Sequence, residues 1–278
     1  MTPERTTLAN QTTTVNILYY GEPGSGKTTA AAHLAKVGRV LYVDAEHGLK
    51  RQPMEALGVP VKNVQLQRKV SFDALEELCE KLGDALTQDP AAYAGVVLDS
   101  LSEIQRALIE ADAPGRFKLT QGDYGVNTQK LRLLLRHFRD LPCSTAFLTH
   151  VRRDEDLDGE VKYGPALTPM LAGDLLGFVD IVCFCRAVPR AGSEEPDYVG
   201  YFRAGRKFTA KDRFNLVPPR LLSPTFDRIL AYVSGVYTRD ALLRASATGE
   251  LLETLDPAQH EWIERLNRAK SATTTKGA

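Results

Sequence analysis

The feature that most constrains this chain is a glycine-rich segment at residues 21–28, which reads Gly-Glu-Pro-Gly-Ser-Gly-Lys-Thr. It fits the phosphate-binding pattern G-x-x-x-x-G-K-[ST] without a mismatch. Glycines allow the backbone to turn several N–H groups toward one point, and a following helix presents its positive N-terminal end to the same point. Residues 15–20 have the character of a strand and residues 28–35 that of a helix, so the flanks meet the motif's requirements.

The chemistry of this motif predicts ATP and Mg²⁺ as cofactors. The ammonium group of Lys27 would reach the β- and γ-phosphates, and the Thr28 hydroxyl would bind Mg²⁺. The residues expected around the phosphates are Gly21, Glu22, Pro23, Gly24, Ser25, Gly26, Lys27, Thr28 and Thr29.

Composition excludes several classes of protein. The formal net charge of zero over 278 residues excludes a generally basic nucleic-acid-binding surface, so any contact with DNA would come from local patches. The four cysteines form no C-x-x-C pair, and Cys183 and Cys185 are expected to be buried on one face of a strand. Without an apolar run of membrane-spanning length or a signal peptide, the sequence predicts a soluble, reduced, cytoplasmic protein with no membrane partner.

Three polar residues follow or end predicted strands, at the positions where ligands bind in parallel sheets. Glu46 follows the strand at 40–43 and would orient or deprotonate the water that attacks the γ-phosphate; the alternative is a surface carboxylate or strand-end cap. Asp99 ends an apolar strand, as in a Walker B segment, and would hold Mg²⁺ through water. His150 ends the strand at 145–150 and would sense whether ATP or ADP is bound, unless it is a structural histidine.

Two segments are expected to be long loops, at residues 112–127 and 151–172. Both contain basic and aromatic residues, which suit binding of a single nucleic acid strand by phosphate contact and base stacking. The acidic residues at 154–156 argue against that interpretation in the second loop.

Lys211 and Arg213 are two apart on a predicted strand and would project from the same face. Two adjacent cations repel each other unless an anion meets both, and the triphosphate of a neighbouring subunit is such an anion. The alternative is a pair of exposed edge charges that discourage aggregation. Residues 180–187, 198–203 and 206–210 are close in sequence and are expected to add to the sheet as antiparallel edge strands.

The chain divides into four predicted parts. Residues 1–14 are a polar arm, and residues 15–217 are an α/β core with a mostly parallel twisted sheet and helices on both faces. Prolines at 218 and 219 mark a boundary to a mainly helical extension at 218–270, and residues 271–278 form a polar tail expected to be disordered.

The order of these segments resembles the RecA-like ATPase core. Residues 44–47, Asp-Ala-Glu-His, are very similar to the bacterial RecA segment that carries the catalytic glutamate, and residues 211–214 resemble the Lys-x-Arg-Phe motif of RadA-type proteins. The chain looks most like phage-encoded RecA-like proteins, which act as single-strand annealing proteins or recombinases. The resemblance covers residues 15–217 and implies a Mg²⁺-dependent ATPase stimulated by DNA.

The resemblance also implies roles for individual residues. Catalysis would involve Lys27, Glu46 and His150, with Lys211 and Arg213 supplied in trans by a second subunit of a ring or filament; His150 stands where RecA has glutamine. Thr28 and Asp99 would hold the metal. The two loops would bind single-stranded DNA, through Arg116, Lys118, Tyr124, Arg152, Arg153, Lys162 and Tyr163. Partners would be single-stranded DNA, further copies of the chain and a single-strand-binding protein.

Two other functions are compatible with the same core. A hexameric helicase or translocase would turn over ATP steadily and unwind duplexes in one direction. An ATP-gated scaffold or loader would use the loops to bind another protein, and single-stranded DNA would leave its ATPase rate unchanged.

Overall fold

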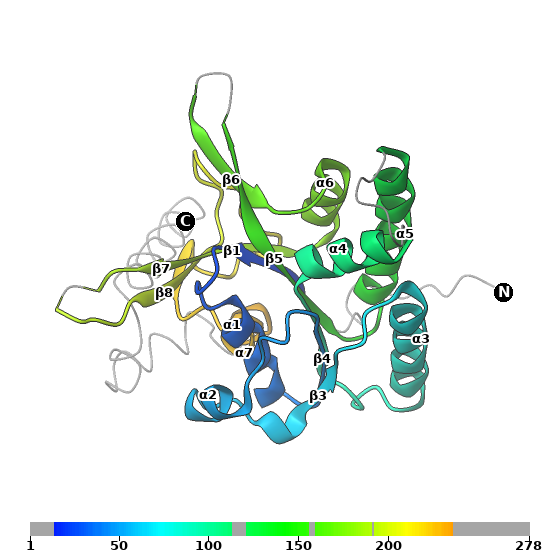
Figure 1. Cartoon of the computed structure of the whole chain (residues 1–278). Coiled ribbons are helices and arrows are strands. Elements are labelled where there is room, and N and C mark those ends of the chain that lie inside the picture. The colour runs from blue at the N-terminus through cyan, green and yellow to red at the C-terminus, as the bar shows by residue number, and fades with distance from the viewer. Residues whose placement is uncertain (1–13, 113–120, 156–158, 191, 236–278) are drawn as a thin grey trace, which may run out of the picture.

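The computed structural model describes residues 14–112, 121–155, 159–190 and 192–235 (Figure 1). These residues form one sheet with the strand order β10-β8-β7-β1-β5-β4-β2-β3, to which β6 adds beside β5 and β9 beside β7. The predicted α/β class, with a mostly parallel sheet and helices on both faces, is confirmed.

The centre of the sheet is parallel. Neighbouring strands pair in the same direction from β3 to β7, so their carboxyl ends meet at one edge. These strands are β1 (Asn16–Gly21), β2 (Val40–Asp44), β3 (Val64–Gln67), β4 (Gly95–Asp99), β5 (Ser144–Glu155) and β7 (Ile181–Val188).

Helices cover both faces of the sheet, as Figure 1 shows. One face packs against α1 (Lys27–Ala32), the 3-10 turn η2 (His33–Lys36), α2 (Arg51–Ala56) and α7 (Phe226–Val233), with the 3-10 turn η3 (Val61–Asn63) beside them. The other face packs against α3 (Phe72–Gln88), α4 (Leu101–Asp112), α5 (Gln121–Arg139) and α6 (Pro169–Phe178).

The alternation of side chains along the strands divides the core into two layers. On β1, Ile17 and Tyr19 face the α1 layer, whereas Leu18 and Tyr20 face the α3–α6 layer, and all four are fully buried. A strand that is apolar on both faces is what a parallel sheet covered by helices requires. This explains why the strands read as unbroken apolar runs.

A side-chain cap fixes the start of α3. The Ser71 hydroxyl accepts a hydrogen bond from the Ala74 N–H at 3.2 Å, which satisfies one of the free donors of the first turn. Leu75, Leu82 and Leu86 recur at helical spacing and are buried against the sheet.

The edge beyond β1 differs from the prediction. β7 runs parallel to β1, because α6 crosses over before it and returns the chain in the same direction. Only β8 (Asp197–Tyr201), β9 (Lys211–Asp212) and β10 (Arg220–Leu222) are antiparallel additions. Residues 206–210 form no strand, and the prediction there was wrong; only isolated bridges at Phe208 occur.

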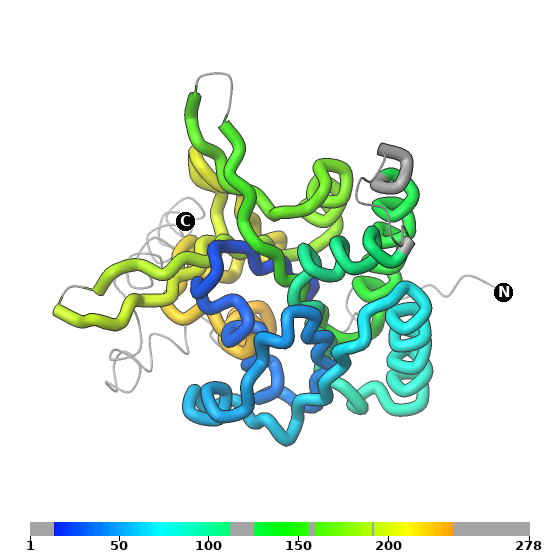
Figure 2. The backbone as a smooth tube through the Cα atoms, viewed as in Figure 1, coloured from blue at the N-terminus to red at the C-terminus, as the bar shows by residue number. Residues whose placement is uncertain are grey.

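The segment expected to be a loop after His150 is instead a β-hairpin. β5 continues through Glu155 and pairs with β6 (Val161–Pro165), and α6 follows from Pro169. The tube in Figure 2 shows this hairpin projecting from the sheet. The prediction of a loop at 151–172 was therefore wrong; residues 156–158, at the tip, lie outside the described residues.

The other predicted loop is shorter than expected. α5 begins at Gln121 rather than at residue 128, so residues 121–127 are helical. Residues 113–120 lie outside the described residues. Asn127 and Thr128 are buried, and tertiary packing of this kind overrides the low helix propensity of the glycines at 122 and 125.

The prolines at 218 and 219 do not interrupt the sheet. β10 follows them directly and pairs with β8, and α7 packs into the α1 layer through Phe226 and Ile229. The proposed division into parts stays a prediction, and the arm at 1–13 and residues 236–278 lie outside the described residues.

Candidate nucleotide-binding site

The P-loop at residues 21–28 joins the carboxyl end of β1 to the start of α1. Gly24 and Gly26 have φ values of 76° and 84°, a conformation that favours glycine. Gly21 is needed for a different reason, since a Cβ there would clash with the carbonyl oxygen of Cys185 on β7. The predicted strand, turn and helix are therefore all present, in the order that the motif requires.

Lys27 lies inside the P-loop. Only 7% of it is exposed, and its Nζ donates to the carbonyl oxygens of Gly21 at 3.0 Å and Glu22 at 2.9 Å. Burial lowers the pKa of the ammonium group, against the raising effect of nearby acidic groups. The two carbonyls are neutral, so they compensate the charge of the Lys27 ammonium only in part. A phosphate bound at this point would supply an anionic partner.

Thr28 and Asp99 lie side by side, as their predicted shared role requires. The Thr28 hydroxyl donates to Asp99 Oδ2 at 2.7 Å, and the hydroxyl of Tyr42 on β2 donates to the same oxygen at 2.7 Å. Burial raises the pKa of the Asp99 carboxyl, while the two hydroxyls lower it. A hydroxyl and a carboxylate at this spacing fit Mg²⁺, which takes few protein ligands and keeps most of its water.

Glu46 is held in the crevice by the turn that follows β2. The buried Asp44 carboxylate accepts from the backbone N–H of Gly48 at 2.8 Å and of Leu49 at 3.4 Å. This turn brings Glu46 Oε1 to 2.8 Å from Nε2 of His150 on β5, and the Ser100 hydroxyl donates to the same Glu46 oxygen. Glu46 and His150, two site residues that were predicted independently of each other, are therefore in direct contact.

The hydrogen bond with His150 is the main cause that lowers the pKa of Glu46, from 4.5 to about 2. Glu46 is therefore ionised at neutral pH, as a residue that orients or activates water must be. Its side chain is 34% exposed and that of His150 is 35% exposed, so water reaches both.

This contact predicts a pH dependence of stability. Because the pKa is lower in the folded state, the contact stabilises the fold above pH 4.5, and this stabilisation is lost as the pH falls toward 2. We expect the difference in free energy of unfolding between the parent and Glu46→Gln to shrink across that range in denaturant titrations. A difference that stays constant from neutral pH to pH 2 would contradict the contact.

A groove of about 730 Å³ runs beside the P-loop and includes Lys27, Thr28 and Thr29. Its far wall comes from Tyr198 on β8 and from Ser223, Pro224 and Thr225 after β10. The ring of Tyr198 lies against Gly26, where a Cβ would be 3.0 Å from the ring. Tyr198, Tyr42 and Ser100 were not predicted as site residues. Ser100 directly follows Asp99 in the sequence, whereas no local pattern connects Tyr198 with the P-loop.

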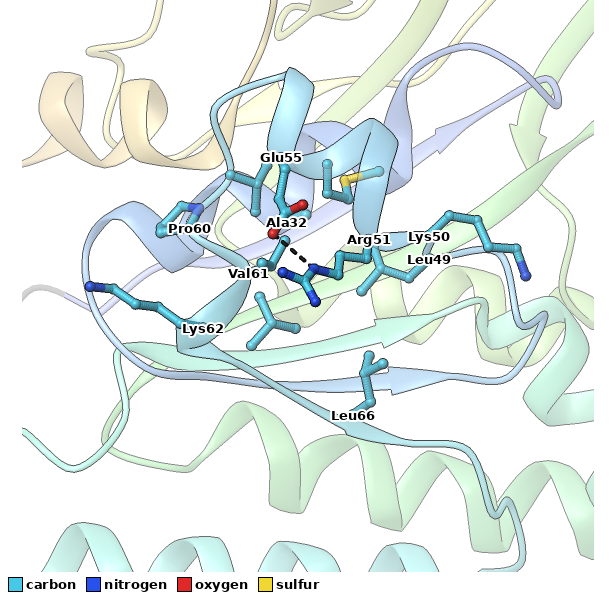
Figure 3. Close-up of a pocket in the computed structure, with 12 residues that line it drawn as sticks. Ala32, Leu49, Lys50, Arg51, Glu55, Pro60, Val61, Lys62 and Leu66 are labelled. Atoms are coloured by element: carbon cyan, nitrogen blue, oxygen red, sulfur yellow. Dashed lines mark hydrogen bonds and ion pairs between the residues drawn. The ribbon is translucent and has the colours of Figure 1, made fainter.

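A second groove, of about 670 Å³, lies between α2 and the edge strand β3 (Figure 3). Apolar side chains such as Leu49, Val61 and Leu66 line it, and an Arg51–Glu55 ion pair of 2.9 Å on α2 forms part of its wall. None of the predicted site residues lines this groove.

Lys211 and Arg213 lie away from the P-loop of their own chain. β9 pairs with the beginning of β7, whereas the P-loop begins beside Cys185, further along β7. Lys211 Nζ donates to the carbonyls of Leu176 and Gly177, and Arg213 binds Gly177 and, at 3.2 Å, Asp180. In one chain the pair therefore caps the C-terminal end of α6, which favours cations.

Four of the predicted DNA-binding residues lie on the hairpin, and their contacts bear on their availability. Arg152 binds Asp154 at 2.8 Å, and Arg153 forms an ion pair with Glu22 of the P-loop and lies 5.7 Å from the centre of the Tyr163 ring. Lys162 pairs in register with Asp154. Arg116 and Lys118 lie outside the described residues, as does the side chain of Tyr124, so the DNA-binding role stays a prediction.

The expectation for the cysteines is confirmed. All four are free and buried, and the sulfur atoms of Cys183 and Cys185 are 3.7 Å apart on β7. Within the described part of the chain, no group of three or more His, Cys, Asp or Glu residues could hold a metal ion.

Together, the fold and the P-loop site define a RecA-like P-loop ATPase. A family model described as "AAA domain" matches residues 13–214, and the chain belongs to this family. None of the described helices is both long enough and apolar enough to cross a membrane.

The chain is also similar to proteins named Protein RecA. It is 28% identical over 248 residues to that of Trichormus variabilis, over 84% of this chain and 62% of that protein. It is 32% identical over 146 residues to that of Nostoc punctiforme and 28% identical over 145 residues to that of Clostridium novyi; each match covers 48% of this chain. These two matches cover 37% and 38% of the relatives, so the chain spans less than two thirds of the relatives' length.

Proposed function

We propose that this chain is a Mg²⁺-dependent ATPase that binds single-stranded DNA and promotes strand annealing or exchange in homologous recombination, in a phage-encoded setting within the bacterial cytoplasm. The observation that carries the proposal is the meeting of Glu46 and His150 at 2.8 Å, beside the P-loop Lys27 and the Thr28–Asp99 pair. Water activation, metal binding and phosphate binding would then share one crevice.

Each residue in this crevice has a proposed task. Mg²⁺, when bound with ATP, neutralises charge on the phosphates. Thr28 and Asp99 would hold the ion, Lys27 would bind the terminal phosphates, and Glu46 would orient the attacking water. His150 would report the state of the phosphates to the hairpin, because it lies on β5, the strand that continues into β6.

The position of Lys211 and Arg213 supports completion of the site by a second subunit. They lie beside the beginning of β7 and contact the end of α6 rather than the P-loop of their own chain, so they would act on the triphosphate of a neighbouring copy. Hydrolysis would then need a ring or filament, with single-stranded DNA and a single-strand-binding protein as further partners.

An annealing assay tests this function directly. With ATP and Mg²⁺, we expect the protein to accelerate pairing of two complementary single strands, and Glu46→Gln to lose any acceleration that needs turnover. Directional unwinding of a duplex without annealing would instead identify a helicase. Neither activity, with ATP binding intact, would favour a scaffold or loader.

A further inference from the structure

One strand connects the hairpin to two parts of the nucleotide site. His150 and Arg153 are three residues apart on β5, so they project from opposite faces of the strand. His150 reaches Glu46 at 2.8 Å, and Arg153 forms an ion pair with the carboxylate of Glu22, the second residue of the P-loop. The proposed hydrolysis of ATP does not use the Glu22–Arg153 ion pair.

Glu22 binds two cations at once. Its backbone carbonyl accepts from Lys27 Nζ at 2.9 Å, and its carboxylate pairs with Arg153. A phosphate that binds Lys27 would break the hydrogen bond to the Glu22 carbonyl. Nucleotide binding would therefore change the contacts of Glu22, the residue whose carboxylate pairs with Arg153. It also brings negative charge close to a guanidinium, whose fork of donors matches phosphate oxygens.

On the hairpin side, Arg153 packs against an aromatic cluster. Its guanidinium carbon lies 5.7 Å from the centre of the Tyr163 ring on β6, and that ring stacks on Phe184 of β7 at 5.6 Å. Phe184 in turn contacts Tyr20 at 5.0 Å and Phe208 at 4.9 Å. A change in the position of Arg153 would therefore alter the packing of Tyr163 on Phe184, at the base of the hairpin.

The ion pair itself contributes little to folding. The side chains of Arg153 and Glu22 are 64% and 54% exposed, and exposed pairs stabilise a fold only slightly. Replacing the pair should therefore leave the protein folded.

We propose that Arg153 is a positioning residue that couples nucleotide binding to the β5–β6 hairpin. The Glu22–Arg153 ion pair holds the hairpin against the P-loop, and the phosphates of a bound nucleoside triphosphate compete with Glu22 for the guanidinium. Nucleotide binding thereby repositions the hairpin. The inference rests on the proposed function for the P-loop ligand and for the hairpin's DNA partner.

A label on the hairpin tests the coupling without DNA. All four native cysteines are buried, so a fluorophore attached to Glu155→Cys would report selectively on the end of β5. We expect a non-hydrolysable ATP analogue to change this signal in the labelled parent and not in Arg153→Gln, at analogue concentrations that saturate both. Arg153→Lys should retain part of the response, because it keeps the charge and loses the fork.

Arg206→Gln is the matched control. Arg206 also forms an exposed ion pair with the hairpin, but its partner is Glu160, the residue before β6, at 2.7 Å, and not a residue of the P-loop. Its label response should equal that of the parent. An unchanged response in Arg153→Gln, or no response in a parent that binds the analogue, would overturn the proposed role.

The second readout is the ratio of nucleotide dissociation constants without and with oligo-dT. Couplings between sites typically change affinity about 5–150-fold, and we expect Arg153→Gln to bring the ratio within about twofold of one, while Arg206→Gln keeps the parent ratio at saturating DNA. A parent ratio that persists in Arg153→Gln overturns the role of Arg153 but leaves the proposed function intact. A parent that binds nucleotide but no DNA contradicts the proposed function, and the label response still decides the role of Arg153.

Discussion

Replacing Lys27 by alanine is expected to lower the affinity for ATP about 100-fold. The ammonium group is buried in the P-loop and has only the carbonyls of Gly21 and Glu22 as partners there, so a phosphate would be its one strong anionic partner. Loss of a charged hydrogen bond costs about 3 kcal/mol at the upper end, which corresponds to the expected change. Titration with a fluorescent ATP analogue measures the affinity.

Lys36→Ala is a suitable control for this experiment. Lys36 lies in η2, directly after α1, and its Nζ is 3.7 Å from Asp227 on the surface. Its removal takes the same charge from the same region without touching the P-loop. A dissociation constant for Lys27→Ala within about threefold of the parent would contradict the assigned site.

The second large effect is expected at Arg213. Replacing it by alanine should leave ATP binding intact and reduce turnover about 1,000-fold or more, as for other arginines that act on a transferred phosphoryl group in trans. If Arg213 only caps α6 through Gly177 and pairs with Asp180, thermal stability should fall and turnover per folded molecule should not. Arg203→Ala, which removes a nearby arginine 3.5 Å from Asp212, is the control.

Mixing two inactive variants separates action in trans from action in cis. An equal mixture of Arg213→Ala and Glu46→Ala should form about one intact interface in four, because a head-to-tail interface takes Glu46 from one subunit and Arg213 from the next. We therefore expect turnover to recover to a corresponding fraction of the parent rate. A mixture that stays as inactive as its components would show that no site is shared between subunits.

Local patterns were sufficient to predict the centre of the fold. The P-loop motif and the apolar strands before Glu46 and Asp99 depend on neighbouring residues, and the structure contains each of them. The meeting of Glu46 and His150 agrees with their positions in sequence, because Glu46 follows β2 and His150 lies where the parallel pairing of β5 with β1 ends, at the same edge of the sheet.

The hairpin at β5 and β6 was missed because few of its residues are fully buried. Its charged strands have no continuous apolar face, so they resemble a loop in sequence. The dipeptide at 158–159, Asp-Gly, is a hairpin signal that was available, and Gly159 has a φ of 74°. The direction of β7 was wrong for a topological reason, since only the crossover through α6 fixes it.

The site residues that sequence reasoning did not find come from distant parts of the chain. Tyr198 is far from the P-loop in sequence and reaches Gly26 only because β8 pairs with β7 beside β1. The Glu22–Arg153 ion pair likewise joins residues that are 131 positions apart. Contacts of this kind depend on the strand order, which no local pattern contains.

The most direct test of the central claim is ATP turnover by the purified protein with and without single-stranded DNA, at low and at moderate salt. We expect DNA to stimulate turnover at low salt and to stimulate it less as salt rises, because phosphate contacts release counterions. No response to DNA at low salt, in protein that binds ATP normally, would contradict a DNA-binding ATPase and favour an ATP-gated scaffold or loader.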